Sequence, residues 1–157
     1  MFQEYYKEYE AIKSGEKQGH IWFVWDEMAG NLIWLESQDK KLAQDIKGKM
    51  GEFLMMGREL AGGSAGILSI LQRPDSSNFS MGSRENYHVK ILLGASSLES
   101  RKMMGFLSDE IPEGFKAGVG KGLIITDEKP YPVSFIVPQI DKSRITRLLQ
   151  KKAQGRS

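Results

Sequence analysis

Cysteine is absent from this sequence, and histidine occurs only twice. The lack of cysteine excludes a disulfide framework and thiolate metal sites, and two histidines are too few for a histidine-based metal site without carboxylate ligands. No apolar run approaches the roughly 20 residues that a membrane helix needs. Charge of one sign is not in excess, since 22 Lys and Arg stand against 20 Asp and Glu, so no overall field points to nucleic acid.

What the chain does contain is the composition of an ordinary globular domain. Its 157 residues are 40% hydrophobic and 27% charged, which fits one soluble domain with a core of its own. There is no internal repeat, no low-complexity segment and no good linker. The N-terminal segment lacks the apolar region of a signal peptide, so a cytoplasmic location is expected.

The apolar pattern predicts strands that alternate with helices. Ser96 and Glu99 form a capping box that predicts a helix start. The expected helices cover 2–13, 42–60, a segment from Ser96 onward, and 141–157. The expected strands cover 21–25, 67–71, 89–93, and a pair joined by a turn, 121–126 and 131–137. This order predicts an α/β layered sandwich with a mainly parallel sheet.

Polar side chains follow two of the predicted strands directly. The strand IWFVW runs into Asp26 and Glu27, and ILSIL runs into Gln72 and Arg73. Ligands of open α/β sheets bind beyond the carboxyl ends of the strands. An Asp at such an end can help to hold Mg²⁺, a Glu beside it can act as general base, and a Gln amide can contact a phosphate or a water.

Each of these features also has a simpler interpretation. A strand can end in an acidic turn without any ligand, and Gln72 and Arg73 can cap the second strand locally. The three tryptophans can stack on bases, but core or interface positions are more common for such residues. The basic segment 142–152 can contact DNA phosphates or can be a solvated helix face.

Taken in order, the motifs resemble the second half of the motor domain of FtsK/SpoIIIE-type DNA translocases, in particular the coupling ATPases of conjugative plasmids and integrative elements. The similarity begins with IWFVWDEMA and ILSILQRPD, with the helix GEFLMMGREL leading to the second strand. It continues through VKILLGASSLESRKMMGF and ends with GVGKGLIITDEKPYPVSFIVPQI. It covers most of residues 20–140, and the ordered combination is more specific than either short motif.

The resemblance implies a RecA-like ATPase half-domain in a hexameric ring that pumps double-stranded DNA, with ATP and Mg²⁺ as cofactors. Asp26 matches the Mg²⁺ residue and Glu27 the water-activating residue. Gln72 matches a polar sensor and, with Arg73, is expected to contact the nucleotide. A basic residue from the neighbouring subunit completes such a site. The regions that can supply this basic residue contain Arg58, Arg73, Arg84 and Lys90. Arg84 is included among the candidate catalytic residues. Lys90 lacks the guanidinium fork that binds a phosphate through two hydrogen bonds.

One family feature is missing, because the sequence has no G-x-x-x-x-G-K-[S/T] phosphate loop. GVGKG at 118–122 lacks the spacing and the Ser/Thr, and it is expected to lead into a strand. Since the family places that loop upstream of the acidic pair, Met1 is expected to begin downstream of it. The chain is then a single partial ATPase domain, with a 20–140 core and a basic helix and tail at 141–157. It is expected to be inactive alone, and the intact protein can be anchored to a membrane through a missing N-terminal region.

Three functions are therefore open at the level of sequence. The first is the C-terminal part of an ATP-driven double-stranded DNA translocase for conjugative transfer, with DNA, relaxosome proteins and other copies of itself as partners. The second is a non-catalytic binding or assembly module that kept the fold and lost nucleotide hydrolysis. The third is an unrelated α/β domain in which the motifs occur by chance.

Overall fold

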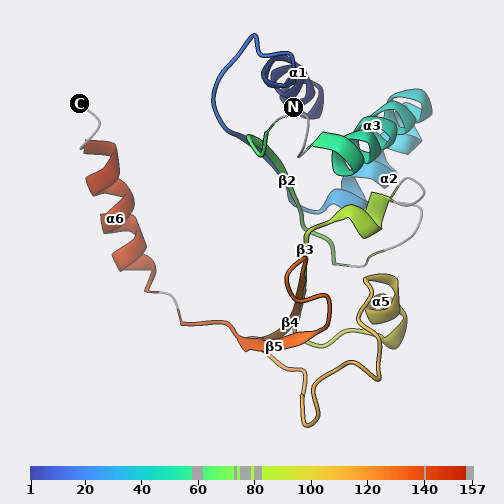
Figure 1. Ribbon diagram of the computed structural model, residues 1–157, viewed down its shortest axis with the longest axis vertical. Coiled ribbons are helices and arrows are strands. Elements are labelled where there is room, and N and C mark those ends of the chain that lie inside the picture. The colour runs from blue at the N-terminus through green and yellow to red at the C-terminus, as the bar shows by residue number, and fades with distance from the viewer. Residues whose placement is uncertain (58–61, 73, 75–78, 80–82, 140, 155–157) are drawn as a thin grey trace.

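The structure is a computed structural model that describes residues 1–57, 62–72, 74, 79, 83–139 and 141–154. In these residues the fold is mixed α/β, with five α-helices, a two-stranded parallel sheet and a three-stranded antiparallel sheet (Figure 1). The helices are α1 (Phe2–Lys13), α2 (Met28–Gln38), α3 (Lys40–Glu52), α5 (Leu98–Met103) and α6 (Lys142–Gln154). The strands are β1 (Ile21–Trp25), β2 (Ala65–Ser69), β3 (Val89–Leu93), β4 (Lys121–Thr126) and β5 (Val133–Ile136).

The parallel sheet consists of β1 and β2, paired from Ile21↔Ala65 to Trp25↔Ser69. Helix α1 packs on one face of it through an aromatic stripe, and the rings of Phe2 and Tyr5 each lie 5.3 Å from the ring of Phe23. The Tyr5 hydroxyl donates a hydrogen bond to the buried carbonyl oxygen of Gly66, 3.1 Å away. Burial raises the pKa of Tyr5, so this hydroxyl remains a neutral donor. Helix α1 is thereby fixed to both strands.

Helices α2 and α3 complete the core on the Phe23 side of this sheet, whereas Trp22, Val24 and Leu68 on its other face are exposed. Met28 and Leu32 of α2 and Met50 of α3 are fully buried. Asp39 ends α2 and caps α3, since its carboxylate accepts a hydrogen bond from the Leu42 amide at 2.9 Å. Because this cap satisfies one of the unpaired amides of the first turn, the chain passes from one helix to the next at this residue.

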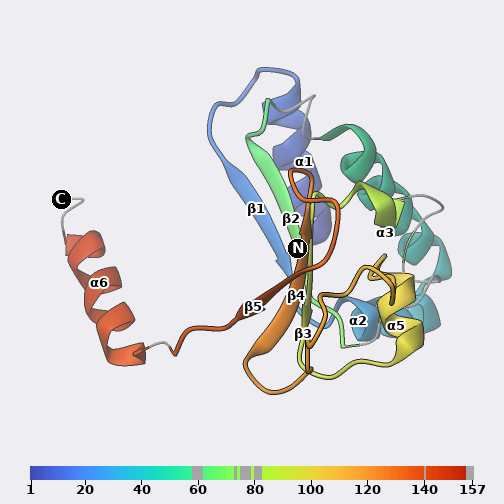
Figure 2. The same cartoon turned by 60° about the horizontal axis from the view of Figure 1, so that its bottom comes forward.

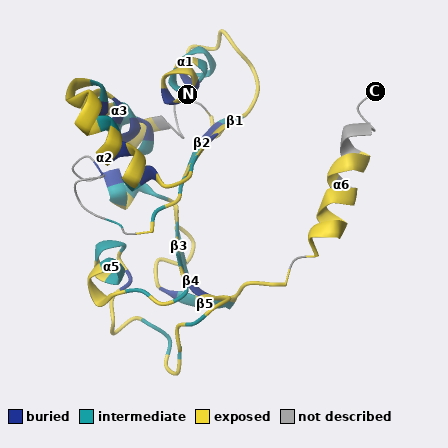
Figure 3. Ribbon diagram, turned by 180° about the vertical axis from the view of Figure 1, so that it is seen from behind, coloured by how far each residue is buried: buried dark blue, intermediate teal, exposed yellow. Residues whose placement is uncertain are grey.

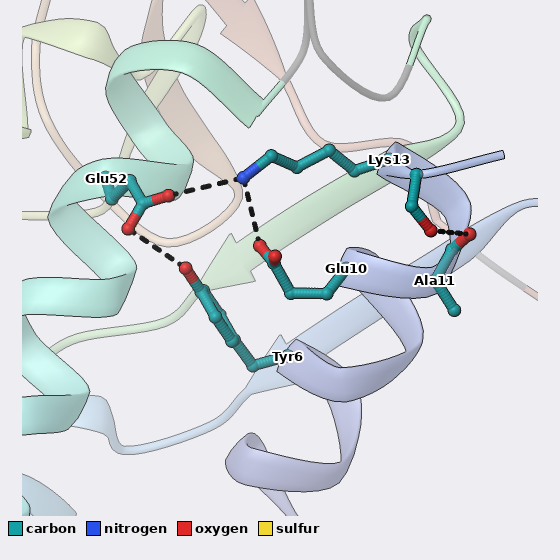
Figure 4. Close-up of polar contacts among 6 residues, drawn as sticks. Tyr6, Glu10, Ala11, Lys13 and Glu52 are labelled. Carbon is teal, nitrogen blue, oxygen red and sulfur yellow. Dashed lines mark hydrogen bonds and ion pairs between the residues drawn. The ribbon is translucent and has the colours of Figure 1, made fainter. Parts of the chain in front are cut away.

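Polar contacts join α1 to the end of α3 (Figure 4). The Tyr6 hydroxyl donates to Glu52 Oε2 at 3.0 Å, and Lys13 Nζ lies 3.5 Å from Glu52 Oε1 and 3.1 Å from Glu10 Oε1. After Glu52 the chain continues as a π-helical turn, Phe53–Gly57. These contacts set the position of α3 relative to α1.

The antiparallel sheet has the order β3–β4–β5. Leu123 of β4 and Phe106, which follows α5, are both fully buried. Helices α1, α2, α3 and α5 lie on one side of the strands, and α6 stands alone on the other (Figures 1 and 2). Figure 3 shows that burial is concentrated around α1, α2, α3 and the first sheet, whereas the described part of α6 is exposed.

The expectation of a mainly parallel sheet is wrong for the described residues, because only β1 and β2 pair in parallel. The chain between β3 and β4 contains α5, which has only six residues, and it brings β4 back antiparallel to β3. The alternation of strands and helices predicted a crossover connection that would make β3 and β4 parallel. Instead β3, β4 and β5 form an antiparallel meander. The described residues contain no helix with the length and apolar content to cross a membrane.

The individual elements match the expectations unevenly. The strands at 21–25, 89–93 and 121–126 are confirmed, and so is the helix at 2–13. The second strand lies two residues earlier than predicted, and α2 was not predicted. The predicted helix 42–60 starts at Lys40, and its residues 58–60 lie outside the described part. Ser97, not Ser96, caps α5, because its hydroxyl accepts from the Ser100 amide at 3.0 Å.

The two buried tyrosine hydroxyls of α1 give the first prediction. Tyr5→Phe is expected to lower the free energy of unfolding by about 1 kcal/mol, because it removes the hydrogen bond to a buried carbonyl. Tyr9→Phe is the matched control: among the described residues the buried Tyr9 hydroxyl has no hydrogen-bond partner, so its removal is expected to be neutral or stabilising. Urea denaturation of both variants measures the difference, and equal losses would contradict the assignment.

Candidate functional site

The carboxyl ends of β1 and β2 are held together by backbone hydrogen bonds that continue past the strands. The amide of Ile70 donates to the carbonyl of Trp25 at 2.9 Å, and the amide of Met28 donates to the carbonyl of Ile70 at 3.1 Å. The turn made by Asp26 and Glu27 is therefore fixed beside the segment that leads to Gln72.

The Glu27 side chain of this turn is in direct contact with the Gln72 side chain, which follows β2. Gln72 Nε2 donates to Glu27 Oε1 at 2.5 Å, across the ends of the two strands. Asn31 Nδ2 donates to the carbonyl oxygen of Asp26 at 2.8 Å. Glu27, Gln72 and the Asp26 side chain are all exposed. The expected proximity of Glu27 and Gln72 at one sheet edge is thus present in the structure.

Glu27 has an unusual backbone conformation. Its φ of 53° and ψ of 39° are left-handed, and among the described residues no other non-glycine residue has positive φ. It precedes α2, and its carbonyl accepts from the Asn31 amide at 3.0 Å, but its side chain does not cap the helix. This conformation costs a non-glycine residue roughly 1–2 kcal/mol, and such strain concentrates at functional sites. Here it accompanies a carboxylate that points at Gln72 and not at the helix amides.

The donor set fits a particular kind of metal binding. No group of three or more His, Cys, Asp or Glu side chains that could hold a metal occurs in the described residues. Mg²⁺ does not need such a group, because it is commonly held by one or two carboxylates together with waters and substrate phosphates. The exposed Asp26 carboxylate could therefore serve as a ligand to a cation that arrives with a phosphate. The Gln72 amide donates one N–H to Glu27. Its second N–H and its carbonyl oxygen can contact the phosphate ligand.

The basic candidates are not gathered at this turn. Arg84 lies in the 3₁₀ turn Ser83–Asn86, and its Nη1 donates to Met103 Sδ of α5 at 2.6 Å. Lys90 is half-buried on β3. Arg58 and Arg73 lie outside the described residues. The structure thus joins Glu27 with Gln72 and places Arg84 against α5.

Sequence reasoning missed Asn31, which holds the carbonyl of Asp26, and the bond from Met28 to Ile70. The only feature of the sequence that could have predicted the contact of Asn31 is its position five residues after Asp26. That spacing becomes informative once the left-handed turn at Glu27 is known, and Glu is not a residue that signals this conformation.

The strain at Glu27 gives a stability prediction. Glu27→Gly is expected to raise the free energy of unfolding by about 0.5 kcal/mol, because glycine adopts positive φ without the Cβ penalty, and its larger unfolded-state entropy offsets only part of the gain. Glu36→Gly exchanges the same residue types within α2, where it also removes the ion pair between Glu36 and Lys47, and is expected to cost about 1 kcal/mol or more. Thermal or urea unfolding compares the two. A loss in Glu27→Gly as large as in the control would show that Glu27 is not strained.

No protein-family model, curated protein or solved structure matches this chain. The functional assignment consequently depends on the geometry of Asp26, Glu27 and Gln72 and on the order of the sequence motifs.

Proposed function

We propose that the turn at Asp26 and Glu27, with Gln72, is part of an ATP site, and that the chain is the C-terminal part of an ATP-driven double-stranded DNA translocase of the FtsK/SpoIIIE type. The observation that carries the proposal is the hydrogen bond from Gln72 to Glu27 across two parallel strand ends. It puts an amide and a carboxylate where ligands bind in open α/β sheets. Conjugative transfer is the process that the resemblance favours.

In this proposal each side chain has a separate task. Asp26 would hold Mg²⁺, which neutralises charge on the triphosphate. Glu27 would accept a proton from the attacking water, and Gln72 would contact the terminal phosphate and keep the Glu27 carboxylate in place. A RecA-like arrangement, the phosphate loop, and Arg73 or Arg84 as further nucleotide contacts belong to the same proposal. So do a hexameric ring, relaxosome partners and a cytoplasmic location.

The second candidate is a binding or assembly module without hydrolysis. The contact of Arg84 with Met103 favours it, because a guanidinium turned toward a thioether is not directed at a phosphate. The two functions differ in one property, which is binding of a metal–nucleotide complex at the acidic turn.

Paramagnetic broadening by Mn²⁺·ATP tests this property. Amide NMR signals of residues 25–28 and 72 are expected to broaden before the rest of the chain, and Asp26→Asn is expected to weaken the effect about ten-fold by removing a carboxylate ligand. Glu27→Gln is expected to retain most of it, since the amide oxygen can still accept from Gln72. Asp109→Asn, which removes an exposed carboxylate elsewhere, serves as the control. Equal broadening with and without Asp26 would exclude the site and favour the assembly module.

Turnover gives a second test. The chain alone is expected to hydrolyse ATP negligibly, because its sequence contains no phosphate loop, and the turn at Asp26 and Glu27 would hold the metal–triphosphate too weakly and loosely for efficient attack by water. Steady-state phosphate release measures this. A rate of about 1 s⁻¹ or more that Glu27→Gln abolished would retain Glu27 as the base but would contradict the requirement for the loop.

A further inference from the structure

One face of the antiparallel sheet is apolar and uncovered. Alternation along β3 puts Val89, Ile91 and Leu93 on the same face, and they are 50%, 51% and 60% exposed. On the opposite face Leu123 of β4 is fully buried, as is Phe106, which follows α5, whereas Ile136 of β5 is exposed. We call the surface made by Val89, Ile91 and Leu93, with the half-buried Ile124 of β4 and Val133 of β5 beside them, the bare face. A contiguous apolar surface of this kind indicates a binding partner.

Helix α6 is an amphipathic helix without neighbours of its own. Ile145 and Leu149 lie one turn apart and are 42% and 63% exposed. Figures 1, 2 and 3 show α6 apart from every other labelled helix and strand. An isolated helix of 13 residues is marginal in water, and helices of this length are normally stabilised by packing an apolar face. Helix α6 therefore also requires a partner.

The short connection between β5 and α6 directs the helix away from its own sheet. The Val137 amide donates to the carbonyl of Gly120 at 2.7 Å, so the chain continues the line of β5. Pro138 follows and restricts Val137 to extended conformations. Packing of α6 on its own bare face would need a reversal of the chain within residues 138–141. A second copy can supply the same face without that reversal.

Length and charge both match such a pairing. Helix α6 is about 20 Å long, and a five-residue strand such as β3 is about 17 Å long. Residues 141–157 contain six of the 22 basic and one of the 20 acidic residues, which leaves 16 basic and 19 acidic residues in 1–140. The helix and tail thus carry a net charge of +5 and the remainder −3, so the two parts of different copies attract each other.

We infer that α6 of one copy packs its Ile145 and Leu149 side on the bare face of a second copy, and that the two copies exchange these helices about a two-fold axis. The five residues 137–141 span at most about 18 Å, which keeps the exchanged helix close to the sheet that it leaves. Two-fold symmetry makes the contact reciprocal and closed. This inference does not depend on the proposed ATP site, and a hexameric ring that contained this contact would consist of three such dimers.

The oligomeric state of the full chain tests the exchange. Sedimentation equilibrium is expected to show a dimer of twice 17.7 kDa. Ile145→Asp/Leu149→Asp is expected to raise the dimer dissociation constant at least about ten-fold, because it places charge in an apolar contact. Ser143→Asp/Gln150→Asp adds the same charge on another side of the helix and is expected to retain the dimer. A monomer at all concentrations, or equal effects of both double variants, would overturn the inference.

Cross-linking identifies the contact itself, and the absence of native cysteine makes it specific. Ile91→Cys protein mixed with Leu149→Cys protein is expected to form a disulfide between residues 91 and 149 of different chains, detected by mass spectrometry of the linked peptides. Leu68→Cys, an exposed position on β2, replaces Ile91→Cys in the control and is expected not to link. If Ile91→Cys/Leu149→Cys in one chain gave only cross-linked monomer, α6 would cover its own sheet and exchange would be wrong.

Discussion

The parallel pairing of β1 with β2 is the constraint on which the candidate site depends. Two parallel strands have no hairpin to join them, and their hydrogen bonds alone give little stability. Here the aromatic side chains of α1 pack on one face, and Tyr5 bonds to the β2 backbone at Gly66. With this register fixed, the bond from Ile70 to Trp25 brings Gln72 alongside Glu27. Packing at the N-terminus thus determines polar geometry at the opposite end of the strands.

The left-handed conformation of Glu27 is the second determinant of the site. A helix that starts directly after a strand needs a sharp change in direction, and Glu27 makes it in a conformation that suits glycine better. The packed strands and α2 on either side can support this local cost. As a result the Glu27 side chain lies across the strand ends and does not cap α2. A glycine would make the same turn but would leave Gln72 without its carboxylate.

Sequence alone predicted the elements that consist of continuous apolar runs, such as IWFVW and VKILL, because turn residues bound both runs. It also predicted that Glu27 and Gln72 would meet, since both follow strand ends. It failed on α2, whose helical start depends on a left-handed glutamate that no residue preference signals. It failed on the parallel sheet as well, because the direction in which β4 returns depends on how residues 94–120 pack. The polar contact of Arg84 depends on the position of α5, which its sequence neighbours do not specify.

The proposed ATPase function requires that the turn at Asp26 and Glu27 binds a divalent cation together with a triphosphate. Anomalous X-ray diffraction at the manganese edge, from crystals grown with Mn²⁺ and a non-hydrolysable ATP analogue, would locate this cation. We expect one anomalous peak at roughly 2.2 Å from an Asp26 carboxylate oxygen, a distance typical of a hard cation, with the terminal phosphate facing Glu27 and Gln72. A peak elsewhere on the chain, or bound analogue with no metal at Asp26, would contradict it.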